Sequence, residues 1–337
     1  MRAASALAVV AMALAAVVPA AGSSRPARSS DVNPLAGLRF YVDRESPSWL
    51  EWEHLKRSGQ SEKADLIWKI AREPKAVWVG RFTSPNFRVK IRRILDGAAA
   101  QDAVPILTVL RAQATGCSPS YDGGGPAEDA RTRAWYDDLA SVIGGDQVVI
   151  AYEPDSLGTI ECLKKSRRDD RLRLLRYGVD RLSALPNATI YIEAGASDWQ
   201  SAKHMAPKLR AVGVAKVRGF MLNATHYDWT RNNIQYGLQL SRLVGGKHFI
   251  INTAENGRGG IHKRLPNGRR LTLWCNPPRR GLGPPPTTDT STSMADAYLW
   301  INRPGYAQSC QGRPIAWYLP RALSYAKYAT DWEAPPR

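Results

Sequence analysis

Short apolar runs alternate with longer amphipathic segments along most of the chain. Eight of these runs predict strands, at residues 40–42, 76–79, 104–110, 148–152, 189–192, 219–222, 249–252 and 298–302. Amphipathic segments with charged faces lie between several of them and predict helices, for example at residues 131–143, 163–185 and 201–212. Continuous apolar strands separated by helices are typical of a parallel sheet covered on its outer face. About eight such units in roughly 300 residues favour a closed or nearly closed α/β barrel over an open sheet.

The first residues of the chain predict an export signal. Arg2 is followed by an uncharged run rich in Ala, Val and Leu over residues 3–18, and Ala20 and Ala21 offer a cleavage site, which gives a signal over residues 1–21. A membrane anchor is the alternative, but the run is short and rich in Ala. Residues 22–36 are rich in Ser, Pro and Arg and predict a flexible leader. We therefore expect a secreted protein without a membrane span, with one folded domain over residues 37–333.

The formal net charge of +17 raises the question of a nucleic-acid partner. No helix-turn-helix, zinc-finger or RNA-binding signature accompanies this charge, so we expect no nucleic-acid partner. A basic surface that attracts anionic polymers or acidic polysaccharide is the favoured interpretation. The sequence also has no nucleotide-binding loop and no metal-ligand spacing, and we expect neither a cofactor nor a metal.

The four cysteines are Cys117, Cys162, Cys275 and Cys310. An exported protein can form disulfides, and four cysteines allow three pairings. A zinc site is the alternative, but no CxxC spacing is present and the histidines do not cluster near the cysteines. We favour the pairings Cys117–Cys162 and Cys275–Cys310, because each joins cysteines that are close in the sequence.

A pair of carboxyl groups directly follows the predicted strand at 148–152. Glu153 and Asp155 flank Pro154 there, and working residues of an α/β barrel lie just past the carboxyl ends of its strands. A carboxyl group held in a low-dielectric barrel mouth has a raised pKa and can donate a proton. Taken alone, the motif favours an ordinary acidic loop between a strand and a helix.

Further segments resemble glycoside hydrolase family 6, the β-1,4-glucanases and cellobiohydrolases. The motif YEPDSLG at 152–158 and the stretches at 40–43, 219–223, 245–249, 274–278 and 296–301 occur in the order of that family. The chain is identified as a divergent member. The resemblance implies a distorted single-domain (β/α) barrel with two disulfide-tied loops around the site. It also implies inverting hydrolysis of β-1,4-glucan, in which one carboxylic acid protonates the leaving oxygen and a second group activates water.

The resemblance also assigns roles to individual residues. Asp155 matches the general acid, and the two favoured cysteine pairings match the family's disulfides. The expected sugar-binding residues are Trp78, Trp199, Asn223, Trp274 and Asn302. Aromatic rings suit this role because sugar rings present flat C–H faces to an indole, and the chain has eleven Trp. We expect a β-glucan polysaccharide or oligosaccharide as the partner of a monomeric protein.

Several family positions carry different residues in this chain. The Asp before the first cysteine is Gly116, a Tyr is Leu110, and the DAGH motif reads Glu193-Ala194-Gly195-Ala196. The family's Lys, Glu and Asp near the last cysteine are Asn302, Tyr306 and Gln308, and a strand that ends in Asp ends here in Asn252.

Two interpretations of these departures stay open. In the first, the protein is an enzyme in which a different residue from the family's own activates the water, and this base is Asp122, Glu153, Glu193 or Asp198. Asp122 precedes three consecutive glycines at 123–125, a loop able to close over substrate. In the second, the protein binds polysaccharide and cleaves it weakly or not at all.

Overall fold

The computed structural model describes residues 32–80, 86–112, 125–266, 268, 270–308, 310 and 315–329. The chain divides into two units, Met1–Asn33 and Pro34–Arg337, and the second contains every helix and strand described below. The predicted export signal lies outside the described residues. Leu35, which the sequence places in the leader, is fully buried in a core cluster.

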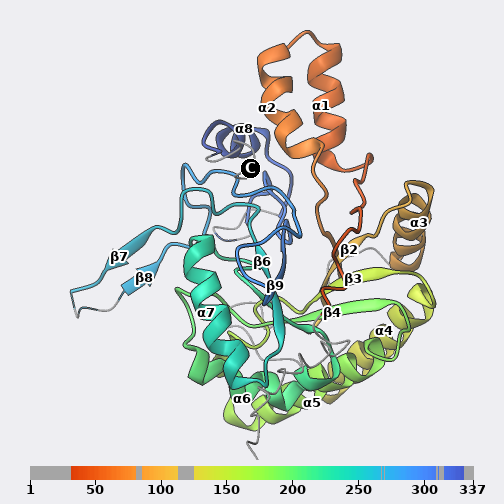
Figure 1. The fold of residues 1–337 in the computed structure, drawn as a ribbon, viewed down its shortest axis with the longest axis vertical. Helices are drawn as coiled ribbons and strands as arrows, with labels where there is room; N and C mark the ends of the chain where they lie inside the picture. The colour runs from red at the N-terminus through yellow and green to blue at the C-terminus, as the bar shows by residue number, and fades with distance from the viewer. Residues whose placement is uncertain are drawn as a thin grey trace, which may run out of the picture. The chain divides into compact units, whose positions relative to one another are not determined.

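The centre of the second unit is a seven-stranded parallel sheet (Figure 1). Its strands are β1 (Val77–Gly80), β2 (Ile106–Leu110), β3 (Val148–Tyr152), β4 (Ala188–Glu193), β5 (Gly219–Leu222), β6 (His248–Asn252) and β9 (Ala295–Leu299), in the order β1-β2-β3-β4-β5-β6-β9. The sheet curls until its two edge strands approach one another. There, the Ala76 backbone N–H donates to the carbonyl of Trp300 at 2.9 Å, and the Trp78 indole N–H donates to that of Ile301 at 2.8 Å. The result is a distorted, incompletely closed barrel.

Helices cover the outside of this sheet (Figure 1). Five of them follow strands β1 to β5 in turn: α3 (Phe87–Ala100), α4 (Pro126–Ile143), α5 (Lys165–Leu182), α6 (Ala202–Val212) and α7 (Thr230–Leu243). Alternate residues of one strand therefore enter two different cores. In β3, Val148, Ile150 and Tyr152 pack against the helices, whereas Val149 and Ala151 fill the barrel interior. This double burial explains why the strands read as continuous apolar runs.

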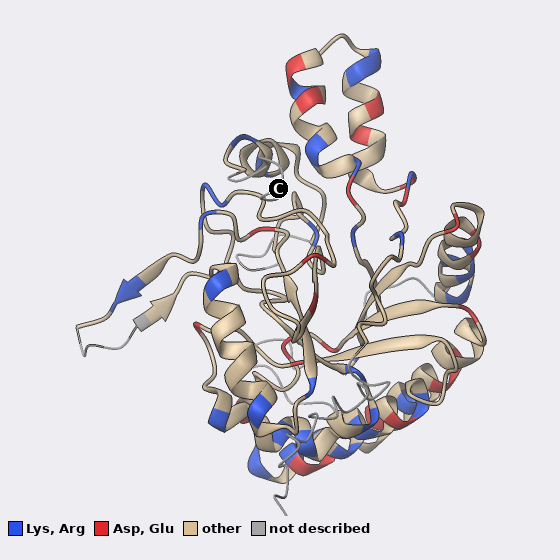
Figure 2. Ribbon diagram, viewed as in Figure 1, with Lys and Arg blue, Asp and Glu red and all other residues tan. Residues whose placement is uncertain are grey.

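The remaining elements lie at the ends of the barrel. Helices α1 (Pro47–Arg57), α2 (Ser61–Ala71) and α8 (Leu319–Lys327) share a third core cluster, to which Leu55, Ile67, Trp300 and Tyr325 contribute. Strands β7 (His262–Arg264) and β8 (Arg270–Thr272) form an antiparallel hairpin that extends away from the sheet (Figure 1). Figure 2 shows that charged residues concentrate on helices and loops. Within the described part of the chain, no helix is both long and apolar enough to cross a membrane.

Most predicted strands are confirmed, but the one at 40–42 is wrong and the one at 298–302 is misplaced. The predictions at 148–152 and 219–222 match β3 and β5. Residues 40–42 form no strand, and only Phe40 makes an isolated bridge, to Val104. The last strand spans Ala295–Leu299 instead of residues 298–302, and the backbone N–H groups of Ile301 and Asn302 donate to the Asn252 side-chain oxygen at 3.0 and 3.1 Å.

One disulfide lies within the described residues. Cys275 and Cys310 are bonded, with a Cα–Cα distance of 6.0 Å, which confirms this predicted pairing. Cys162 also takes part in a disulfide. Its predicted partner, Cys117, lies outside the described residues.

Candidate active site

Asp155 lies in a tight turn at the carboxyl end of β3. The backbone φ angles of Glu153 and Asp155 are +56° and +66°, in the left-handed region that side chains other than glycine rarely adopt. The Asp155 backbone carbonyl accepts hydrogen bonds from the backbone N–H and hydroxyl of Thr159, at 2.9 and 2.7 Å. The Thr225 hydroxyl, which follows β5, donates to Asp155 Oδ1 at 2.5 Å. The carboxyl group of Asp155 is therefore held, partly exposed, at the barrel mouth.

Glu153, one of the candidate bases, is buried on the other side of this turn. Its carboxylate accepts the backbone N–H groups of Arg111 and Ala112, both at 2.9 Å, and the hydroxyl of Tyr136 at 2.5 Å. Burial raises the pKa of Glu153 against the opposing effect of these hydrogen bonds. Glu153 thus anchors the chain that leaves β2 and is enclosed by protein donors.

Glu193 lies at the end of β4, directly behind the Asp155 turn. Its Oε2 accepts the backbone N–H groups of Leu157 and Gly158 at 2.9 and 3.3 Å, and its Oε1 accepts that of Gly195 at 2.6 Å. Burial, reinforced by the negative charge of Asp155, raises the pKa of Glu193 to about 7. These contacts give Glu193 a supporting position, because its oxygens are directed at the backbone of the turn.

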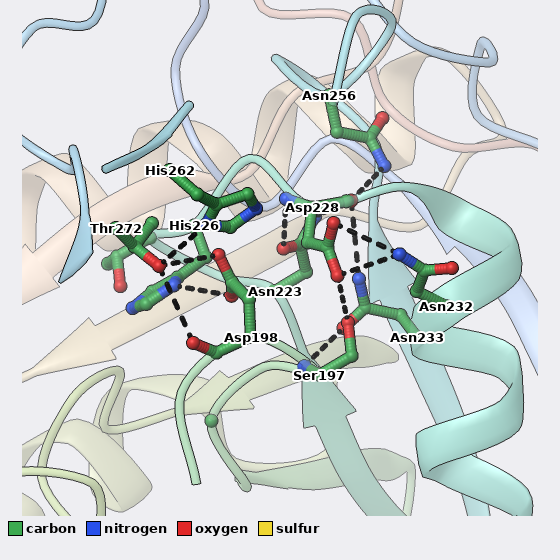
Figure 3. Close-up of polar contacts among 12 residues, drawn as sticks. Ser197, Asp198, Asn223, His226, Asp228, Asn232, Asn233, Asn256, His262 and Thr272 are labelled. Carbon is green, nitrogen blue, oxygen red and sulfur yellow. Dashed lines mark hydrogen bonds and ion pairs between the residues drawn. The ribbon is translucent and has the colours of Figure 1, made fainter. Parts of the chain in front are cut away.

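Asp198, a further candidate base, is paired with a histidine (Figure 3). His226 Nδ1 lies 2.9 Å from Asp198 Oδ1, and the Thr272 hydroxyl donates to Asp198 Oδ2 at 3.2 Å. Burial disfavours the charged forms of His226 and Asp198, but the hydrogen bond and the attraction between the two side chains outweigh this effect. The pKa of His226 is therefore raised and that of Asp198 lowered. The negative charges of Asp155 and Glu193 raise the pKa of His226 further.

A second polar cluster joins the loop after β4 to the start of α7 (Figure 3). The buried carboxylate of Asp228 accepts the Ser197 hydroxyl at 2.6 Å and the Asn232 side-chain amide at 3.1 Å. These bonds fix the segment that carries Asp198 and Trp199.

The three predicted sugar-binding tryptophans lie in different environments. Trp199 stacks on the His226 ring, with centroids 4.9 Å apart, and packs against Gly158 so closely that an added Cβ there would lie 2.2 Å from the indole. Trp78 carries the guanidinium of Arg303 over its ring, 4.9 Å from the centroid. Trp274 is 53% exposed beside the Cys275 disulfide. Trp274 therefore offers the most accessible surface of the three.

The two predicted sugar-binding asparagines are engaged within the protein. Asn223 is fully buried, and its amide donates to the backbone carbonyls of Asp228 and Asn252 at 3.2 and 3.0 Å. The Asn302 amide donates to Glu255 Oε2 at 2.7 Å. Burial raises the pKa of Glu255 to about 7. A sugar contact through the N–H groups of Asn223 would require its two bonds to break.

The remaining predicted positions add no carboxylate to the described site. Gln308 donates through its side-chain amide to the Tyr227 hydroxyl at 3.3 Å, and Tyr306 packs against Arg303. Asp122 and Gly116 lie outside the described residues. Among the residues that the structure describes, no group of three or more His, Cys, Asp or Glu side chains could hold a metal ion.

Sequence reasoning missed Thr225 and His226. They follow β5 directly, and the rule that barrel sites form past the strand ends could have found them.

Known proteins resemble this chain over most of its length. The family described as Glycosyl hydrolases family 6 matches residues 35–313. Endoglucanase A of Cellulomonas fimi is 35% identical over 295 residues, which are 86% of this chain but only 61% of that protein. Endoglucanase A of Thermobispora bispora is 31% identical over 99% of this chain and 69% of its own length.

A solved structure supports the same relationship. The endoglucanase Cel6 from Mycobacterium tuberculosis, in complex with methyl-cellobiosyl-4-deoxy-4-thio-β-D-cellobioside, superimposes with a TM-score of 0.78 at 36% identity. The superposition covers 88% of this chain and 99% of that one. The extent of the family match and these identities lead to one conclusion: the chain belongs to glycosyl hydrolase family 6.

Proposed function

We propose that the protein is an exported β-1,4-glucanase that cleaves cellulose-like glucan with Asp155 as proton donor. The observation that carries this proposal is the position of the Asp155 carboxyl group, partly exposed at the barrel mouth and held by the Thr225 hydroxyl at 2.5 Å. The matched relatives bear the name endoglucanase, and the superimposed structure holds a thio-linked cellobioside. Both support a β-1,4-glucan as the substrate.

The surroundings of Asp155 suit an acid that gives up a proton during the reaction. In the inverting mechanism the acid protonates the leaving oxygen while water attacks the opposite face of the sugar. The charge that then forms on Asp155 is favoured by the His226–Asp198 pair, whose imidazole carries a raised pKa. Glu193 has a pKa of about 7, so it is largely protonated in mildly acidic solution. In that state it does not repel the negative charge on Asp155.

The water-activating group is the open element of this proposal. Glu153, Glu193 and Asp198 each accept two or more hydrogen bonds from the protein. Asp122, outside the described residues, is therefore the base that we propose. The same engagement of the described carboxylates supports a second candidate function, a glycan-binding protein with little turnover.

Replacement of Asp155 tests the hydrolytic proposal. We expect Asp155→Asn to lower the release of reducing ends from soluble β-glucan by roughly 10²- to 10⁴-fold, the usual contribution of an acid–base group. The matched control is Asp65→Asn, an exposed position on α2, which should retain full activity. Equal rates for the wild type and Asp155→Asn would refute the role of Asp155. Absence of turnover in all three proteins, with retained glycan binding, would support the second candidate.

Export and domain organisation form part of the proposal. The mature protein begins after the signal at 1–21, and one monomeric barrel domain over residues 37–333 follows the leader. The Cys275–Cys310 disulfide suits an oxidising compartment outside the cell. N-terminal sequencing of protein collected from the culture medium tests this point, and a first residue of Met1 would contradict it.

A further inference from the structure

Arg303 lies at the seam between the edge strands β1 and β9, with its guanidinium between two aromatic rings. Its Cζ atom is 4.9 Å from the centroid of Trp78 and 4.3 Å from that of Tyr306. Trp78 is itself fixed, because its indole donates to the carbonyl of Ile301 at 2.8 Å. Stacking on rigid aromatic rings restricts the plane in which a guanidinium can lie.

This guanidinium has no acceptor in the part of the chain that the structure describes. Arg303 Nε is buried without a hydrogen-bond partner. Neither terminal nitrogen is among the buried unpaired atoms, and neither has an ion-pair or hydrogen-bond partner in the described ranges, so both reach the surface. Buried polar groups nearly always have a partner, and an unpaired donor beside two accessible ones indicates a place for an acceptor.

A second cation lies beside Arg303. The Lys90 ammonium donates to the Trp78 carbonyl at 3.3 Å. Burial lowers the pKa of Lys90, and the charge of Arg303 lowers it further, as expected for neighbouring like charges. The two positive charges repel each other unless an anion binds between them.

The nearby carboxylates do not neutralise these two cations. Asp43 is engaged by both terminal nitrogens of Arg93, at 3.0 and 3.1 Å. Glu255 accepts from Asn302, and burial raises its pKa to about 7, so it carries only part of a charge near neutral pH.

Arg303 is also suitably placed relative to Asp155. Both lie at the carboxyl ends of the parallel strands, and one strand, β2, separates β1 from β3. Since neighbouring strands are about 4.8 Å apart, the ends of β1 and β3 are about 10 Å apart. Arg303 contacts β1 through Trp78, so it lies about two strand spacings from the Asp155 turn, where it can reach a neighbouring sugar of the same glycan.

We propose that Arg303 binds a carboxylate group carried by the glycan, and that the preferred ligand is a β-1,4-glucan with sugars oxidised to the carboxylate at C6. The inference rests on the proposed function, because it assumes a β-1,4-glucan in the site. A guanidinium fork binds a planar carboxylate through two parallel N–H···O bonds. The ammonium of Lys90 adds a second favourable charge.

Calorimetric titration of the Asp155→Asn protein, which should bind without turnover, tests this site. The two ligands are a neutral β-1,4-gluco-oligosaccharide and the same oligosaccharide carrying C6 carboxylates. We expect the carboxylated ligand to bind about 10- to 100-fold more tightly, as charge-assisted hydrogen bonds allow. Adding Arg303→Met should bring the ratio of the two affinities close to one. Arg303→Lys, which retains charge without the fork, should give an intermediate ratio.

The matched control is Arg242→Met, at an exposed position in the last turn of α7, and thermal unfolding checks that each variant is folded. A ratio unaffected by Arg303→Met, or reduced equally by Arg242→Met, would overturn the proposal in favour of general surface charge. If the protein with Arg303 intact binds both ligands equally tightly, the proposed carboxylate site is wrong, and the proposed glucan function is unaffected. Failure to bind either ligand would instead overturn the proposed glucan function on which it rests.

Discussion

The buried carboxyl group of Glu193 should make the stability of the folded chain fall as the pH rises. Burial, with the charge of Asp155, raises its pKa from 4.5 to about 7. Below pH 4.5 the group is protonated in both the folded and the unfolded chain, and its contribution to stability is fully present. Between these two values the unfolded chain releases the proton and the folded chain retains it, so the free energy of unfolding decreases.

The size of this decrease follows from the width of the interval. Each pH unit between the two pKa values corresponds to about 1.4 kcal/mol, so the contribution lost between pH 4.5 and pH 8 is about 3 kcal/mol. Glu193→Gln removes the titration. The difference in unfolding free energy between wild type and this variant should therefore shift by about 3 kcal/mol in favour of the variant over that range.

Urea unfolding of both proteins at pH 4.5, 6 and 8 measures this shift. The matched control is Glu62→Gln, at an exposed position on α2, measured at the same three pH values. A constant difference for Glu193→Gln would show that Glu193 titrates alike in the folded and unfolded chains. That result would refute the reasoning from its burial.

Three further predictions concern the neighbourhood of the site. Gly158→Ala places a Cβ 2.2 Å from an indole ring and should lower the unfolding free energy by about 1–3 kcal/mol, whereas Gly145→Ala, with no atom within 4 Å, should not; equal thermal melts would contradict this. Asp198→Asn should lower the pKa of His226, as followed by NMR titration of the imidazole, because their hydrogen bond and attraction raise it; an unchanged titration would exclude this pairing. Cys275→Ser opens a loop of 35 residues and should reduce the unfolding free energy by about 4 kcal/mol in the chain-entropy model. Unchanged denaturant midpoints would show that the disulfide adds no stability.

The fold was largely predictable because most strands of the parallel sheet are buried on both faces. Such strands appear as uninterrupted apolar runs, and β3 and β5 could be placed to the residue. An uninterrupted apolar run also makes the end of a strand hard to predict from the sequence. The apolar run continues past Leu299 through Trp300 and Ile301, but the Ile301 backbone N–H donates to the side-chain oxygen of the distant Asn252 instead of to a neighbouring strand.

The candidate site was predictable in its position but less so in its details. A Glu-Pro-Asp motif after an apolar strand indicated a carboxyl group at the barrel mouth. In an extended chain the side chains of Glu153 and Asp155 would point to the same side. Here both residues have a left-handed backbone conformation, and Glu153 is buried whereas Asp155 is partly exposed. Two of the backbone donors to Glu193, those of Leu157 and Gly158, come from the loop after β3, and no pattern in the sequence indicates that contact.

The seam between β1 and β9 has a consequence for how the molecule fluctuates. Separating two inner strands breaks a whole ladder, whereas the described seam is joined by the Ala76–Trp300 backbone bond and by side-chain bonds to the Ile301 carbonyl. Local opening should therefore begin there, and the Ala76 amide should exchange its hydrogen with solvent sooner than that of Ile150. Such local opening would let the barrel widen at this seam while the inner strands of the sheet stay paired.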